Sequence, residues 1–191
     1  DANGAVARQD SFAADASLLA KAGVAPRFSV SQAAPGALQA VYVAGGALYY
    51  SPLSSTPGQV LTGTKLSGDS SQVWQARLAV DGSGGGHVVW EEGADGDGFT
   101  LQARDSSDGG KTWGPANQLY SGSADNPASI SLQLGADRAH QAHLAWDAAE
   151  GIWYRRWTAA GGWGEPAKLS TITRVRGVQL AVTHDGLARA V

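Results

Sequence analysis

Short runs of alternating apolar and polar residues, separated by glycine-containing turns, recur along most of the chain. In one unit the apolar run Leu78-Ala79-Val80 leads through a turn to His87-Val88-Val89-Trp90. A second unit runs from Leu132-Gln133-Leu134 to His143-Leu144-Ala145-Trp146. Alternation with a period of two and turn dipeptides such as Asp81-Gly82 predict β-hairpins rather than helices.

Weaker copies of this hairpin extend the repeat toward both ends, from Phe28-Ser29-Val30 to Ala40-Val41-Tyr42 and from Leu180-Ala181-Val182 to Ala188-Arg189-Ala190-Val191. After each of the first three copies comes a second hairpin. These second hairpins run from Leu48-Tyr49-Tyr50 to Lys65-Leu66-Ser67, from Leu101-Gln102-Ala103 to Gln118-Leu119-Tyr120, and from Ile152-Trp153-Tyr154 to Lys168-Leu169-Ser170. The repeat length of about 50 residues is that of a four-stranded blade. We therefore predict an all-β fold of β-propeller blades, each with four antiparallel strands, and about three and a half blades in residues 25–191.

Residues 1–24 lie outside the repeat and are predicted to form an N-terminal arm. Asp10 or Ser11 could cap a short helix that runs to about Ala22, and Gly23 could end it. A short helix is favoured over an unstructured peptide.

Composition narrows the class of protein. The chain has 191 residues with 26 glycines and seven tryptophans, which indicates one turn-rich packed domain. Its net charge is −3, so it lacks the positive charge that nucleic-acid binding requires. There is no cysteine, which excludes disulfides and thiolate metal sites. No apolar run approaches the roughly 18 residues of a membrane span. The chain begins at Asp1 without an initiator methionine, so removal of a signal peptide and a secreted or cell-surface location are expected.

One motif lies between the two hairpins of the second unit. The segment Ser106-Ser107-Asp108-Gly109-Gly110-Lys111-Thr112-Trp113 reads S-x-D-x-G-x-T-W. It resembles the Asp-box of sialidases and other BNR-repeat proteins, which joins the third and fourth strands of a propeller blade. A short acidic side chain can bind the backbone N–H groups of a tight turn, and a tryptophan can bury its ring against the next strand. The residues assigned this structural role are Ser106, Asp108, Gly110, Thr112 and Trp113.

The third unit has a worn version of the box, Ala160-Gly161-Gly162-Trp163, which lacks the aspartate. The resemblance covers residues 25–191 as a repeat, but it carries one full Asp-box. In such families the box lies away from the binding face, so it identifies architecture rather than chemistry.

The resemblance to sialidases implies an active site with three arginines, a Tyr–Glu nucleophile pair and an Asp acid/base. Only Arg27 lies near the place of the first arginine, and Arg104 and Arg156 have no matching motif. No catalytic residue is assigned. The alternative stays open that the chain is a fragment or divergent member of a sialidase-like exo-glycoside hydrolase, with most catalytic residues outside it.

Metal and cofactor sites are not predicted. His140 and His143 are three residues apart, which places their side chains on opposite faces of a strand, so they cannot share a zinc ion there. Asp95 and Asp97 resemble a calcium loop, but further oxygen ligands at regular spacing are absent, and a solvated hairpin tip is favoured.

The aromatic residues of the third blade carry the remaining candidate chemistry. Tryptophan faces stack on sugar rings and a guanidinium binds hydroxyls or carboxylates, so the cluster is a candidate glycan platform. Packing between blades is the favoured alternative, because each propeller sheet lies between two others. The candidate glycan-binding residues are Trp153, Arg155, Arg156 and Trp157.

The sequence thus favours a non-catalytic secreted propeller module that binds glycan or protein partners or acts as an assembly scaffold. The last residue, Val191, lies in an apolar strand. We therefore expect another chain, or a further C-terminal part, to complete the propeller, because an open ring would expose blade faces and a strand edge.

Overall fold

The computed structural model describes residues 28–34, 37–53, 63–69, 71–93, 98–123, 130–171, 177–183 and 185–191. The predicted arm at 1–24 and its helix lie outside these residues, as do Arg27, Asp95 and Asp97. Every regular element among the described residues is a β-strand. The all-β prediction is confirmed, and none of these residues forms a helix that could cross a membrane.

The first two sheets each contain four antiparallel strands that follow one another in chain order. Blade 1 consists of β1 (Phe28–Ala34), β2 (Ala37–Ala44), β3 (Ala47–Leu53) and β4 (Thr64–Lys65). Blade 2 consists of β5 (Val73–Val80), β6 (Gly86–Gly93), β7 (Gly98–Ser106) and β8 (Asn117–Ser123). The predicted hairpins therefore lie where the alternating pattern placed them.

Blade 3 has the same order, but its outermost strand is divided in two. It consists of β9 (Leu132–Ala136), β10 (Gln141–Ala148), β11 (Gly151–Thr158), β12 (Gly162–Trp163) and β13 (Ala167–Ser170). Both β12 and β13 pair with β11. Pro166 lies between them, and a proline has no N–H to donate to a β-ladder. Blade 4 is represented by the hairpin of β14 (Leu180–Val182) and β15 (Ala188–Ala190).

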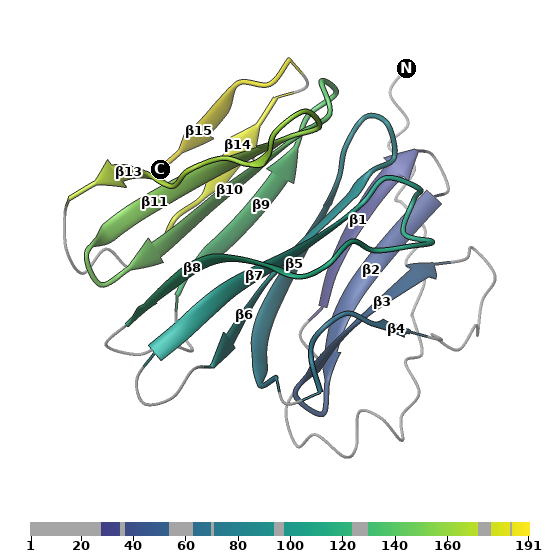
Figure 1. Cartoon of the computed structure of the whole chain (residues 1–191). Coiled ribbons are helices and arrows are strands. Elements are labelled where there is room, and N and C mark those ends of the chain that lie inside the picture. The colour runs from purple at the N-terminus through teal and green to yellow at the C-terminus, as the bar shows by residue number, and fades with distance from the viewer. Residues whose placement is uncertain are drawn as a thin grey trace, which may run out of the picture.

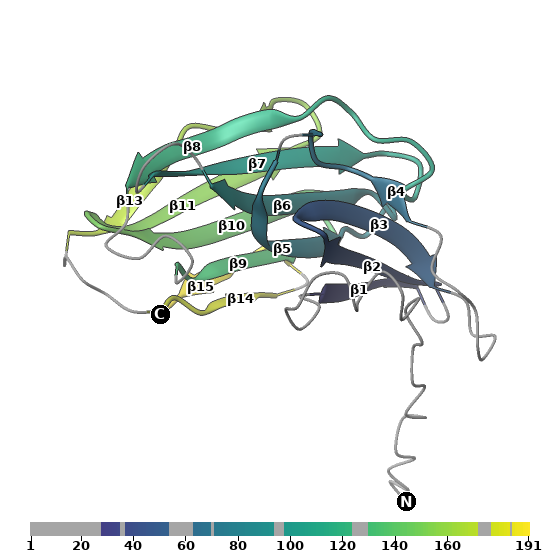
Figure 2. The ribbon, with the colours of Figure 1, turned by 90° about the horizontal axis from the view of Figure 1, so that it is seen from below.

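The blades are arranged as a fan around their first strands (Figure 1). Contacts join β1 to β5, β5 to β9, and β9 to β14. Figure 2 shows these four strands along one side of the molecule, with β8 on the opposite side. First strands that gather on one side while the outer strands spread apart are typical of β-propeller blades around a central axis.

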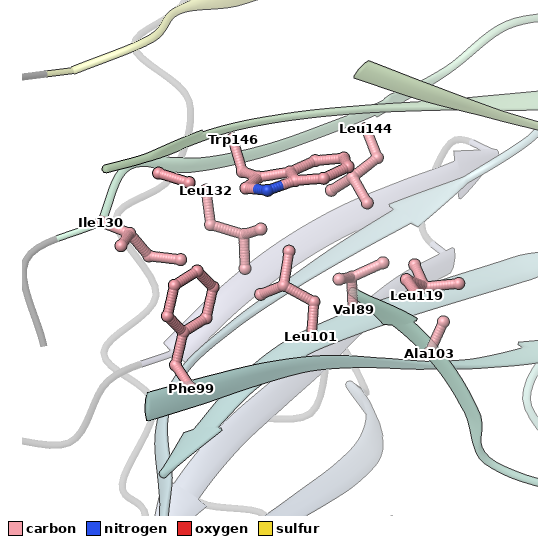
Figure 3. Packing of buried hydrophobic residues seen from close by; sticks show 10 residues of the cluster. Val89, Phe99, Leu101, Ala103, Leu119, Ile130, Leu132, Leu144 and Trp146 are labelled. Atoms are coloured by element: carbon pink, nitrogen blue, oxygen red, sulfur yellow. The ribbon is translucent and has the colours of Figure 1, made fainter. Parts of the chain in front are cut away.

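Two hydrophobic cores fill the spaces between blades. The core between blades 2 and 3 contains Val89, Phe99 and Leu101 from blade 2 facing Leu132, Leu144 and Trp146 from blade 3 (Figure 3). The core between blades 1 and 2 joins Val41, Leu48 and Tyr50 to Leu78, Val88 and Trp90. Burial of each large apolar side chain contributes about 1.5–3 kcal/mol, so face-to-face packing holds the blades together.

The Asp-box forms the turn between β7 and β8, as the motif predicts. The Asp108 carboxylate accepts hydrogen bonds from the Thr112 backbone N at 2.9 Å, the Thr112 hydroxyl at 2.6 Å and the Ser106 hydroxyl at 2.8 Å. Ser106 Oγ in turn accepts a bond from the Gly110 backbone N. The prediction that Asp108 organises its own turn is confirmed.

The box also docks blade 2 onto blade 1. Trp113 is half-buried beside the core between blades 1 and 2, and its ring contacts Tyr50 edge-on at a centroid distance of 5.0 Å. Gly110 has a φ of +84°, and a Cβ there would lie 2.0 Å from the Tyr50 hydroxyl oxygen. Only glycine fits this conformation and this contact. These contacts hold the turn between β7 and β8 and join it to blade 1.

Candidate functional site

Blades 2 and 3 place a buried aspartate and a buried histidine at equivalent positions of their first hairpins. In blade 2, Asp81 follows β5 and His87 begins the return strand, with His87 Nε2 at 3.4 Å from Asp81 Oδ2. The second ring nitrogen, Nδ1, lies 2.8 Å from Asp105 on β7. The indole of Trp157 from blade 3 covers the imidazole at a centroid distance of 4.4 Å. His87 is thus enclosed between two carboxylates and an indole.

Two opposing effects act on the His87 pKa. Burial disfavours the charged imidazolium, but hydrogen bonds and charge from Asp105 and Asp81 outweigh it and raise the His87 pKa. For Asp81, burial acts to raise the pKa, but hydrogen bonds from His87, Ser83 and Gly85 lower it well below its usual range. The cluster therefore favours an ion pair at the contact between blades 2 and 3.

Blade 3 repeats the aspartate and histidine but differs in the third partner. His143 Nε2 lies 3.3 Å from Asp137 Oδ2, and His143 Nδ1 lies 2.7 Å from the Tyr154 hydroxyl on β11. Asp137 Oδ1 accepts a hydrogen bond from the Gln141 backbone N at 2.9 Å. Burial raises the Tyr154 pKa, although nearby Arg156 acts in the opposite direction, so this phenol stays protonated at neutral pH. We call Asp137, His143 and Tyr154 the blade 3 relay.

The relay ends at a surface pocket on the same face of blade 3. The pocket has a volume of about 340 Å³. It is lined by Tyr154, Arg156 and Thr158 of β11, by Gly161, Gly162, Gly164 and Glu165 of the following turn, and by Ala167 of β13. Three of these residues are glycines, so backbone as well as phenol, guanidinium and carboxylate groups can reach a bound molecule. We call this the blade 3 pocket.

The four residues predicted to bind glycan do not share one surface. Successive side chains of a strand point to opposite faces, and β11 places Trp153, Arg155 and Trp157 on the face toward blade 2. Trp153 packs against the core between blades 2 and 3, and Arg155 donates a hydrogen bond to the Leu119 carbonyl. Trp157 covers His87. Arg156 alone lies on the opposite face, where it lines the blade 3 pocket.

The opposite ends of these strands carry two more buried carboxylates that the sequence analysis missed. Glu91 on β6 accepts a hydrogen bond from Gln75, whose amide also donates to the Ile130 carbonyl of blade 3. Asp147, at the equivalent position of β10, accepts bonds from the Ser131 and Gly177 backbone N atoms. These bonds tie neighbouring blades together. The signal was an acidic residue after each strand tryptophan, at Trp90-Glu91 and Trp146-Asp147.

His140 does not lie on a strand, so the sequence argument about its spacing from His143 used the wrong local structure. It lies in the turn before β10 with a φ of +60°, and its Nδ1 is 3.8 Å from Asp81 Oδ1. Within the part of the chain that the structure describes, no group of three or more His, Asp or Glu residues is arranged to hold a metal ion.

Three solved glycoside hydrolases resemble this chain in structure. An α-L-arabinofuranosidase from Fusarium graminearum, bound to an iminosugar inhibitor, superposes with a TM-score of 0.57 and 12% identity over 81% of this chain and 50% of its own. An α-L-arabinanase from Penicillium chrysogenum, complexed with arabinobiose, gives 0.56 and 12% over 81% of this chain and 51% of its own. A Hadza microbial sialidase gives 0.56 and 14% over 82% and 39%.

The chain thus spans about half the length of these proteins, or less. No protein-family model and no curated protein matches the sequence. At 12–14% identity the likeness concerns the fold alone. The described residues therefore have the fold of part of a propeller like those of glycoside hydrolases.

Proposed function

We propose that this chain is part of a secreted, non-catalytic β-propeller of the Asp-box kind that binds glycan, and that the blade 3 pocket is its binding site. The pocket is lined in part by Gly161 and Gly162 of the worn box turn, so this proposal departs from the expectation that the box lies away from the binding face. The observation that carries the proposal is a pocket of about 340 Å³ whose lining includes Tyr154, Arg156 and Glu165. Ligand sites commonly have volumes of about 300–1,000 Å³ and a few convergent polar groups. A saccharide unit is of matching size and polarity.

The state of the buried carboxylates supports a binding role over a catalytic one. Asp81 and Asp137 accept hydrogen bonds from their own turns, at Gly85 and Gln141. Glu91 binds Gln75, whose amide also donates to the Ile130 carbonyl of blade 3, and Asp147 accepts a bond from the Gly177 backbone N. A glycosidase acid or nucleophile must instead reach a glycosidic bond. All four carboxylates accept hydrogen bonds that hold a turn or a strand of the fold.

A second candidate function is glycoside hydrolysis by a larger protein to which this chain contributes blades. The longer glycoside hydrolases that share the fold favour it, since this chain covers 39–51% of their length. In that case the catalytic acid, base and nucleophile come from residues outside the described part of the chain. The two functions differ in whether the longer protein that contains these blades releases sugar, and release by the purified chain itself would also contradict the non-catalytic proposal.

Calorimetric titration of the purified chain with arabinobiose and with sialyllactose tests the binding proposal. We expect at least one of the two to bind, and we expect Arg156→Ala to weaken binding about tenfold, because one charge-assisted hydrogen bond is lost. Arg138→Ala is the matched control, since Arg138 is exposed but does not line the pocket. Absence of binding, or equal effects of the two variants, would contradict the proposal.

Fluorogenic arabinofuranosides and sialosides separate binding from hydrolysis. We expect no release of the fluorophore by the purified chain. Release that survives Arg156→Ala would favour the second candidate function and would place the reacting groups away from the blade 3 pocket.

We also propose that a further polypeptide packs against the exposed side of blade 1 and beside β15, away from the blade 3 pocket. Phe28 on β1 is 65% exposed, and Val191 beyond β15 is 83% exposed. Exposed apolar side chains at both ends of the fan favour association with another polypeptide segment. Light scattering should then give a mass above the 19.6 kDa of one chain. A stable monomer would contradict this proposal.

A further inference from the structure

The two histidines at equivalent positions have different hydrogen-bonding demands. His87 has carboxylates at both ring nitrogens, Asp105 at Nδ1 and Asp81 at Nε2. Both nitrogens must donate to satisfy two acceptors, which is the pattern of an imidazolium. His143 has a carboxylate only at Nε2, from Asp137, and has the Tyr154 phenol at Nδ1. A neutral imidazole with one proton satisfies both of these partners.

The position of the Asp137 carboxylate decides which nitrogen of His143 carries that proton. An ionised carboxylate only accepts, so Nε2 must donate to Asp137 Oδ2. Nδ1 then offers a lone pair, and the Tyr154 hydroxyl must donate its proton inward to Nδ1. The turn of blade 4 covers the inner end of the relay, because a Cβ at Gly186 would lie 2.8 Å from Asp137 Oδ2. The buried Asp137 carboxylate therefore fixes the orientation of the Tyr154 hydroxyl proton through His143.

An inward-pointing proton leaves the Tyr154 oxygen with only lone pairs to offer to a ligand. Tyr154 and Glu165 are then two acceptors in the blade 3 pocket, and Arg156 is the charged donor. Two acceptors suit the hydroxyl donors of an uncharged sugar. A carboxylate could pair with Arg156, but at Tyr154 and Glu165 it would find acceptors instead of donors.

We propose that the relay of Asp137, His143 and Tyr154 fixes Tyr154 as a hydrogen-bond acceptor, so that the blade 3 pocket selects neutral saccharides over carboxylate-bearing ones. This inference rests on the proposed glycan-binding function and names its ligand class. Tyr154 is the selecting residue. His143 and Asp137 are positioning residues, because they act on the ligand only through Tyr154.

Asp137→Asn is the most direct test, because the side chain keeps its size while the donor and acceptor roles of His143 and Tyr154 are exchanged. The new amide oxygen keeps the bond from Gln141 N, which places the amide NH₂ toward His143 Nε2. Nε2 must then accept, so the ring proton moves to Nδ1 and donates to Tyr154. The hydroxyl proton turns outward into the pocket. Asp81→Asn is the matched control, since Asp81 occupies the same position in blade 2 and does not line the pocket.

Two measurements test the inference on the intact chain. Nitrogen NMR of ¹⁵N-histidine-labelled protein should show His143 protonated at Nε2, and at Nδ1 in Asp137→Asn. Titration calorimetry should show tighter binding of arabinobiose than of sialyllactose. Asp137→Asn and Tyr154→Phe should each weaken arabinobiose binding about tenfold, and Asp81→Asn should change it less than twofold. Tyr154→Phe keeps the test valid if Asp137→Asn does not fold.

The outcomes separate this inference from the proposed function. His143 protonated at Nδ1, or at both nitrogens, in the native chain at neutral pH would overturn the relay. The expected NMR result with tighter binding of sialyllactose would overturn the selection while leaving glycan binding in place. Binding of neither sugar would overturn the proposed function and the selection with it.

Discussion

Blades 2 and 3 carry the same aspartate and buried histidine at the same places, yet an indole from the next blade covers one histidine, and the other is bonded to a tyrosine that lines a pocket. Above His87 lies Trp157, which blade 3 contributes across the contact between the blades. His143 is bonded to Tyr154 from its own blade, and Tyr154 lines the blade 3 pocket. The position of Asp105 in β7, opposite His87, is occupied in β11 by Arg156, opposite His143.

This difference shows that repeated blades can retain the same buried Asp–His pair while the residues on their third strands differ. The aspartate that binds its own turn is retained in both blades. The residues on the third strand differ, because their side chains face the next blade or solvent and not the turn. Function in such a fold is therefore sought on the third strand of a blade and not in the shared Asp–His pair.

The largest expected effect tests the framework that the two blades share. Trp90 and Trp146 occupy equivalent positions of β6 and β10 and are almost fully buried. We expect Trp90→Ala and Trp146→Ala each to lower the free energy of unfolding by about 3–5 kcal/mol, as for other large-to-small core changes. Urea unfolding measures this. A loss below about 1 kcal/mol in either variant would show that the two cores are not equivalent.

The next effect concerns the enclosure of His87. Trp157 is half-buried, so Trp157→Ala should cost about 1–2 kcal/mol, less than a core tryptophan. It should also make His87 accessible to solvent. Trp157→Phe is the control and should retain most of the stability, because a ring still covers the imidazole. Equal losses in both variants would mean that the cover does not depend on an aromatic ring.

The hairpin repeat and the Asp-box could be predicted because both depend on local sequence. The alternation in Leu78–Trp90 and Leu132–Trp146 reports which side chains face a neighbouring sheet, and the box residues bind within their own turn. The division of the outer strand of blade 3 was missed, although Pro166 marks it. Local sequence patterns thus predicted the strands, but they did not predict the break in the outer strand of blade 3.

The site was predicted less well, for two separate reasons. Trp153, Arg155, Arg156 and Trp157 were grouped by closeness in sequence, although the strand alternation already separates Arg156 from the other three. The relay could have been suspected from the aspartate six residues before each histidine, at Asp81 and Asp137. The pocket itself depends on how the turn from Gly161 to Glu165 folds beside β11, which no local pattern states.

A smaller effect, on stability against pH, tests the charge of His87. Its pKa is raised above the ordinary value of 6.5, so its contribution to stability is complete below about pH 6.5 and is lost as the pH rises through the raised pKa. We expect the free energy of unfolding to fall over that range. Asp105→Asn should reduce the fall, because Asp105 is the main partner that raises the pKa. Urea unfolding at several pH values measures both, and a flat profile in the unmodified chain would exclude the ion pair.

The smallest effect compares the full Asp-box of blade 2 with the worn turn of blade 3. Hydrogen bonds from the Thr112 hydroxyl and backbone, and from Ser106, lower the Asp108 pKa to about 2. The contribution of this depressed pKa to stability is present above the ordinary Asp value near 3.8 and is lost as the pH falls through about 2. The amide proton of Thr112, which donates to Asp108, should therefore shift in NMR spectra with a midpoint near that pH. The Gly164 amide in blade 3 donates to the Arg156 carbonyl and should show no such titration, because that turn has no aspartate. An unchanged Thr112 signal down to pH 2, or a matching shift at Gly164, would mean that Asp108 does not hold its turn through its charge.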